Sequence, residues 1–90
     1  MIVSYFATIR TYTGETARRL DSAPPTLRLL LLQLAERYGT SFRRAVFAGA
    51  ELSAQIIILV NGRNVLYLQG LETQLKASDE VSIFPMVAGG

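Results

Sequence analysis

Few residues in this chain could do chemistry, because the usual catalytic side chains are missing. The 90 residues contain no Cys and no His, which removes the commonest thiol nucleophile, general base and metal ligand. The seven carboxylates are scattered, apart from the adjacent pair Asp79 and Glu80. We therefore predict no catalytic residue, no bound cofactor and no metal site. We expect the chain to serve catalysis as a carrier or a non-catalytic subunit.

The last five residues carry the one group with distinctive chemistry. Pro85 cannot continue a central strand, so the sequence predicts a free tail after it. The tail consists of Met86, Val87, Ala88, Gly89 and Gly90. Five extended residues reach about 17 Å, and two glycines without side chains can pass through a narrow channel to a reactive centre.

The α-carboxylate of Gly90 is the group that this tail would deliver. A carboxylate is inert toward nucleophiles until it is coupled to AMP as a mixed anhydride, which a sulfur or nitrogen nucleophile can then open. The chain has no phosphate-binding loop of its own, so a separate enzyme that uses ATP must perform the coupling.

Length and composition indicate one small domain over residues 1–85, with residues 86–90 as its tail. Half of the sequence is hydrophobic, which is too apolar for disorder. A domain of this length has an expected radius of gyration of about 12 Å and a single small core. No apolar run approaches the ~20 residues of a membrane helix, and the N-terminus lacks a signal-peptide pattern. We expect a cytoplasmic protein without a membrane partner.

Hydrophobic spacing in the first half predicts a hairpin followed by helices. Residues 2–9 alternate as a strand, residues 11–14 suit a turn, and residues 16–21 suit a charged edge strand. Thr26 is a good N-cap for a helix over 27–38, and Gly39 suits a left-handed end to it. A short second helix is predicted over 42–47.

The second half predicts strands joined by turns. In order, the segments are a loop over 48–53, a strand over 55–60, a return through 63–65, an irregular segment over 66–76, a turn over 77–80 and a last strand over 81–84. The β-branched residues of 55–60 favour a strand buried on both faces. Asn61-Gly62 is a strong hairpin signal, and we expect Leu71 and Leu75 to lie in the core.

This order of elements predicts an α+β fold. A helix with an apolar stripe needs a sheet face to cover, so we expect a mixed four- to five-stranded sheet on one main helix. The last strand should lie beside the first and parallel to it, as in the β-grasp, or ubiquitin-like, architecture. If Val81 and Ile83 face the helix, Phe84 lies on the open side beside Phe6. We expect Phe84, Pro85 and Phe6 to form a partner interface next to the tail.

The basic residues indicate solvated surface rather than a nucleic-acid site. The pairs Arg18-Arg19 and Arg43-Arg44 are separated, the net charge is only +2, and no series of aromatic residues accompanies them. We therefore expect no nucleic-acid partner. Lys76, the only lysine, is interpreted as a turn residue.

The sequence resembles the MoaD/ThiS family of ubiquitin-like sulfur carriers, and most of all the small subunit of molybdopterin synthase. The matching segments are Tyr5-Phe6-Ala7, Leu34-Ala35-Glu36-Arg37-Tyr38, Ile58-Leu59-Val60-Asn61-Gly62 and the block from Leu75 to Gly90. The terminal block is the specific part. Family members often have a second proline where this chain has Met86, and the segment 61–70 is longer here than in compact members.

The resemblance implies a mechanism and partners. In the family, the terminal glycine, here Gly90, is adenylated by a ubiquitin-activating-type adenylyltransferase that uses ATP. A persulfide from a sulfur donor enzyme then converts it to a thiocarboxylate. In molybdopterin synthase the tail inserts into the large subunit, which the position matching Phe84 contacts. The sulfur goes to the dithiolene of the pterin precursor, during molybdenum or tungsten cofactor biosynthesis.

Three alternatives share the same sequence features. The chain could carry sulfur for thiazole synthesis or tRNA thiolation, or it could be a ubiquitin-like modifier in which Gly90 forms an isopeptide bond with a target lysine. It could also be a β-grasp binding module whose Gly-Gly ending is accidental. The carriers and the modifier share the activation step, so the sequence does not separate them.

Overall fold

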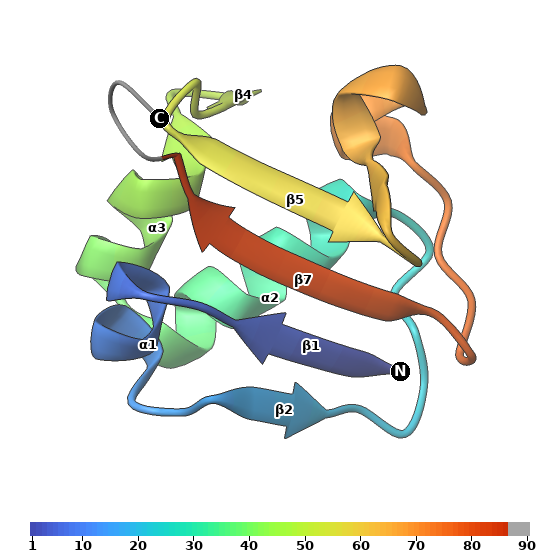
Figure 1. Cartoon of the computed structure of the whole chain (residues 1–90), viewed down its shortest axis with the longest axis horizontal. Coiled ribbons are helices and arrows are strands. Elements are labelled where there is room, and N and C mark those ends of the chain that lie inside the picture. Colours follow the sequence, from blue (N-terminus) through green and yellow to red (C-terminus); the bar gives the residue numbers. More distant parts are fainter. Residues whose placement is uncertain (87–90) are drawn as a thin grey trace.

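The computed structural model describes residues 1–86, which form a sheet packed on helices (Figure 1). The strands of this sheet lie in the order β2-β1-β7-β5-β6. Their bounds are β1 Ile2–Tyr5, β2 Ala17–Arg19, β5 Ile56–Val60, β6 Arg63–Asn64 and β7 Glu80–Pro85. The helices are α1 Thr8–Thr13, α2 Leu27–Tyr38 and α3 Thr40–Val46, with short 3₁₀ turns η1 Val65–Tyr67 and η2 Gly70–Glu72. A separate two-stranded ribbon pairs β3 Phe47–Ala48 with β4 Glu51–Leu52.

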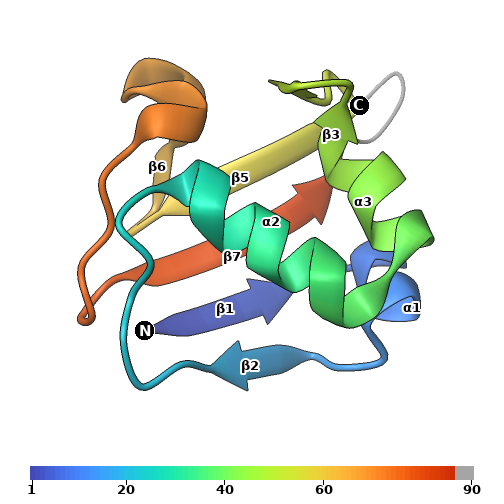
Figure 2. The same ribbon diagram turned by 180° about the vertical axis from the view of Figure 1, so that it is seen from behind.

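The sheet has the predicted mixed topology. β1 runs parallel to β7, while the pairs β1–β2, β5–β7 and β5–β6 are antiparallel. Figure 1 shows the strands in front of the helices, and Figure 2, the view from the other side, shows α2 crossing in front of the sheet. The β-grasp prediction is therefore confirmed, and the radius of gyration of 11.8 Å matches the expected value.

The core lies between the sheet and α2, where the buried side chains of the strands pack against those of the helix. Alternate strand residues point to one face, so Val3, Tyr5, Val81 and Ile83 are fully buried. From α2, side chains at helical spacing cover them, namely Leu27, Leu30, Leu31, Leu34 and Ala35. The predicted N-cap is confirmed, because the Thr26 hydroxyl accepts a hydrogen bond from the Leu29 N–H.

The prediction for residues 6–13 is wrong. The strand ends at Tyr5, and the following residues form α1 instead of continuing the strand and turning at 11–14. Ala7 has φ 51° and ψ −129°, and the Phe6 carbonyl accepts from the Ile9 N–H at 3.1 Å. This is the geometry of a type II′ turn, which normally requires glycine at the position of Ala7. The turn redirects the chain into α1, whose Ile9 is buried.

Three further predictions change in detail. Residues 48–53 include the β3–β4 ribbon rather than forming a simple loop. In β5 the buried residues alternate with half-buried ones, so only one face is fully covered. Gly39 has the predicted positive φ, 98°, but its ψ of −165° is extended, which lets α3 begin at once. The Asn61-Gly62 hairpin is confirmed, with φ values of 51° and 82°.

Candidate functional site

The predicted tail begins at the end of the central strand, β7. This strand is flanked by β1 on one side and β5 on the other. The Ile83 carbonyl accepts from the Phe6 N–H at 3.1 Å, and the Met86 N–H donates to the Gln55 carbonyl at 2.8 Å. The backbone is therefore fixed on both sides up to Met86.

The prediction that Pro85 ends the last strand is wrong, since Pro85 pairs in register with Ile56. Successive backbone N–H groups of a strand point to opposite sides. Because the N–H of Met86 faces β5, the nitrogen of Pro85 faces the side of β1, and β1 has already ended at Tyr5. The N–H that proline lacks would face beyond the end of β1, so its absence leaves no carbonyl of β1 without a hydrogen-bond donor.

Phe6 and Phe84 form an aromatic pair on the open side of the sheet, as predicted. Their ring centroids are 4.3 Å apart and the planes differ by only 9°. Both rings are half-buried. The Arg10 guanidinium lies over the Phe6 ring at 5.5 Å, and its Nε donates to the Tyr5 carbonyl at 2.8 Å. Arg10 thus extends the apolar pair with a positive charge held in place by the backbone.

A small hollow of about 210 Å³ lies beside the same end of β7. It is bounded by α1, by Ala45 of α3, and by Pro85 and Met86. Two exposed apolar side chains stand at it, Tyr12 at 38% and Met86 at 48% exposure. Exposed apolar side chains therefore lie beside the residue after which the predicted tail begins.

A hydrogen-bonded network of four side chains connects β1 to its neighbours. The Tyr5 and Tyr38 hydroxyls are 3.0 Å apart, the Tyr38 hydroxyl donates to Glu15, and Arg18 pairs with Glu15 at 3.0 Å. Burial raises the pKa of Tyr5 and of Tyr38. The hydrogen bond from Tyr38, followed by that from Arg18, lowers the pKa of Glu15. All four groups are engaged with one another, so the network serves to join β1, β2 and α2.

The structure brings together four of the predicted site residues, Phe6, Phe84, Pro85 and Met86. Val87, Ala88, Gly89 and Gly90 lie outside the described residues, so their predicted roles stay predictions. Sequence reasoning missed Arg10 and Tyr12, because their segment was assigned to a strand and a turn. The spacing of Ile9 and Tyr12 before Gly14 is the one signal that favours a helical turn there.

Two further properties concern residues 1–86 alone. No group of three His, Cys, Asp or Glu side chains lies close enough in this part of the chain to hold a metal ion. None of its helices has the length and apolar character needed to cross a bilayer.

Comparison with known proteins finds one matching family and several similar proteins. A sequence model of the ThiS family matches residues 3–90. A candidate sulfur carrier protein of Archaeoglobus fulgidus is 44% identical over 71 residues, which are 79% of this chain and 81% of the relative. The solution structure of small archaeal modifier protein 1 from Methanosarcina acetivorans is 36% identical, with a TM-score of 0.81 over 99% of this chain and 94% of that one. A chain in the BexX/CysO complex of Amycolatopsis orientalis is 29% identical, with a TM-score of 0.83 over 99% and 98%.

Proposed function

This chain belongs to the ThiS family of ubiquitin-fold sulfur carriers and small modifiers, and from that membership we propose that it carries sulfur on the carboxyl group of Gly90. The observation that supports this most directly is the end of β7. Met86 is pinned to Gln55 through its backbone, yet its side chain is half exposed. The described fold therefore ends at its surface and not in its core, as a carrier that presents a terminal group to an enzyme requires.

The chemistry begins with activation by a separate adenylyltransferase. A carboxylate oxygen of Gly90 attacks the α-phosphorus of ATP, and pyrophosphate leaves. The terminal sulfur of a donor persulfide attacks the carbonyl carbon of the acyl-adenylate, and AMP leaves. A second thiol on the donor side then cleaves the sulfur–sulfur bond, which leaves a thiocarboxylate on Gly90 and a disulfide on the donor. Glycine suits this sequence because it leaves the carbonyl carbon unhindered.

The described surface supplies the docking that these steps need. The Phe6–Phe84 pair and the hollow at Met86 adjoin the point where the predicted tail begins. An enzyme that binds this surface would fix the direction of the tail, which lowers the entropic cost of bringing Gly90 to a reactive centre. The carrier itself supplies no catalytic side chain.

For the enzyme that uses this sulfur, we propose molybdopterin synthase, with this chain as the small subunit bound to the large one and the pterin precursor as the acceptor, in molybdenum or tungsten cofactor biosynthesis. This finer assignment rests on the resemblance of the terminal block 75–90, and Phe84 is its proposed contact with the large subunit. It places the chain in the cytoplasm with the ATP and persulfide that the activation consumes. Carriers for thiazole synthesis or tRNA thiolation would share every step before the acceptor.

A second candidate function is conjugation to other proteins. It is favoured by the full-length likeness to a small archaeal modifier protein at 36% identity. In that role a lysine amine of a target would open the acyl-adenylate or a derived ester, and an isopeptide bond to Gly90 would form.

Intact mass spectrometry tests the proposal. The chain ending at Gly90 is incubated with an adenylyltransferase of the ubiquitin-activating type, ATP and a persulfide donor. We expect a mass increase equal to one oxygen-to-sulfur exchange, and none in a variant lacking Gly90, which should fold as stably as the full chain because a tail contributes little packing. An unchanged mass with all available activators would contradict the proposal. Transfer of the sulfur to the pterin precursor in the presence of the large subunit supports the synthase role, while lysine-linked ladders support the modifier.

A further inference from the structure

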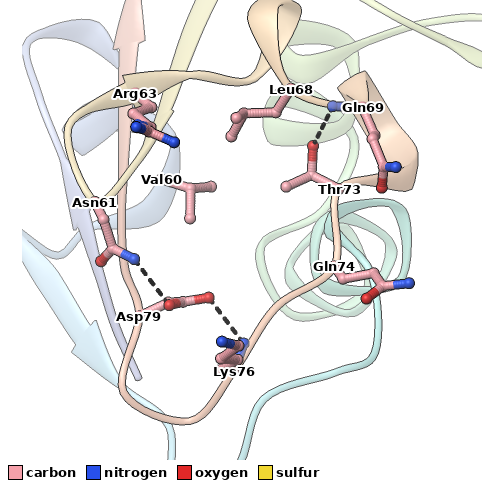
Figure 3. Close-up of a pocket in the computed structure, with 9 residues that line it drawn as sticks. All are labelled: Val60, Asn61, Arg63, Leu68, Gln69, Thr73, Gln74, Lys76 and Asp79. Carbon is pink, nitrogen blue, oxygen red and sulfur yellow. Dashed lines mark hydrogen bonds between the residues drawn. The ribbon is translucent and has the colours of Figure 1, made fainter.

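A larger hollow lies at the opposite end of β7 from the tail. It is a groove of about 640 Å³ between the β5–β6 hairpin, the η1–η2 segment and the turn that precedes β7 (Figure 3). Val60 and Leu68 give it apolar wall, and polar side chains surround them. We refer to it as the hairpin groove.

The hairpin groove carries a net positive charge. Arg63 and Lys76 both line it, on either side of the opening in Figure 3. The ion pairs among residues 1–86 are Arg18–Glu15 and Arg28–Glu72, so neither groove cation has a carboxylate partner within that range. Among residues 1–86, Asp79 is the only carboxylate that lines the groove.

The carboxylate of Asp79 accepts hydrogen bonds from two neighbouring segments of the chain. One oxygen accepts from the Asn61 side-chain amide at 2.8 Å, and the other accepts from the Lys76 backbone N–H at 2.8 Å. Asp79 is buried to 8% exposure, so it holds the turn and the hairpin together. Asp79 offsets one of the two positive charges that line the groove, so a net positive charge remains for a ligand.

Apolar surface continues directly from the groove. A second hollow of about 250 Å³ shares Arg63 and Leu68 with it and adds Tyr67. Leu66 is 67% and Tyr67 is 88% exposed, more than the other large apolar side chains of residues 1–86. The 3₁₀ turn that bears them is held by the Asn64 side chain, which accepts from the Leu66 N–H at 3.0 Å. Exposed apolar side chains on a fixed turn mark an interaction site more often than a random surface.

We propose that the hairpin groove binds an extended acidic peptide segment of a partner protein. Carboxylates of the segment would pair with Arg63 and Lys76, and a neighbouring apolar side chain would pack on Tyr67 and Leu68. Charge complementarity selects this occupant over a basic one. Two cations and one aromatic ring are too few for the stacked bases and continuous positive path of a single-stranded nucleic-acid site.

The position of the groove gives this contact a use in a carrier. The groove and the Phe6–Phe84 pair lie at opposite ends of β7, whose six residues span roughly 20 Å. A partner bound in the groove would leave the tail root uncovered, so the chain could stay attached to one protein while another acts on its terminus. The binding itself does not depend on the activation of Gly90.

Peptide binding to the unmodified chain tests the proposal. The probe is a fluorescein-labelled ten-residue peptide in which Asp and Glu alternate with Leu and Phe. Its controls are the same peptide with Lys in place of each acid, and a ten-nucleotide single-stranded DNA. We expect the acidic peptide to bind with a Kd below about 1 mM, to weaken as salt is raised, and to shift backbone NMR signals selectively in residues 60–79.

Three variants assign the binding to the groove. Arg63→Glu combined with Lys76→Glu should weaken it at least about tenfold, and so should Tyr67→Ala. Arg44→Glu, which changes an exposed arginine of α3 outside the groove, should leave it within about twofold because exposed charges remote from the binding site are screened by salt. Failure of the acidic peptide to bind, equal binding of the basic peptide or the DNA, or insensitivity to the groove variants would overturn the proposal. Thiocarboxylate formation on Gly90 should be unaffected by all of these variants.

Discussion

Replacing Phe84 by alanine should weaken docking of the activating enzyme far more than the folding cost alone explains. Burying a full Phe side chain contributes about 3–5 kcal/mol relative to Ala. Phe84 is half-buried against Phe6, so its loss should cost roughly 2 kcal/mol of unfolding free energy. For a domain of this size that lowers the Tm by roughly 8–16 °C.

The docking effect is measured by ATP–pyrophosphate exchange with the adenylyltransferase, at a temperature well below the Tm of the variant. If Phe84 is an interface anchor, its removal costs about 2 kcal/mol of binding, or about a 30-fold rise in KM for the carrier. The kcat should be unchanged, because the carboxylate of Gly90 is the same in both proteins.

A matched control separates docking from stability. Leu71 is the buried residue of η2, at 6% exposure, away from the Phe6–Phe84 pair. Leu71→Ala should therefore destabilise the fold by about 2 kcal/mol or more without altering KM. The interface assignment fails if Phe84→Ala is folded with the KM of the wild type, or if Leu71→Ala raises KM equally.

Three further changes test the fold that positions this surface. Ala7→Gly should raise the unfolding free energy by about 1 kcal/mol in urea unfolding, because glycine relieves the strain of the positive φ and offsets its own entropy cost; a loss of stability would contradict the strained turn. Thr26→Ala should lower the unfolding free energy by about 1 kcal/mol through loss of the N-cap, whereas Thr26→Ser should retain most of it. Because the pKa of Glu15 lies below its ordinary value of 4.5 in the folded chain, its stabilisation is present above that value and is lost as the pH falls through the folded pKa. Glu15→Gln should therefore flatten the acid side of a stability–pH profile, and an unchanged profile would refute this role.

Elements with strong local signals could be predicted from the sequence. The helix over 27–38 has regular apolar spacing and a side-chain cap, and its bounds agree with α2. The β-grasp architecture predicts the last strand beside the first, and that topology places Phe84 beside Phe6, as the structure shows. The aromatic pair therefore follows from strand alternation once the neighbouring strands are known.

Elements that depend on tertiary contacts could not be predicted. α1 has only six residues, too few for a helical period to stand out. Its position depends on the contacts of α1 with α3 and β7, and on a turn conformation that alanine rarely adopts. The hairpin groove has the same origin, because the bond between Asn61 and Asp79 joins two turns that are distant in the sequence.

The pairing of β1 with β7 has a consequence for how the protein is made. Ile2 is in register with Glu80, so strands from the two extremes of the described chain must meet before the sheet has its centre. Contacts between such distant segments slow folding, and they postpone it during translation until the last strand has left the ribosome. A nascent chain therefore lacks the Phe6–Phe84 pair, because Phe84 lies on that last strand and reaches Phe6 only once β7 has paired with β1.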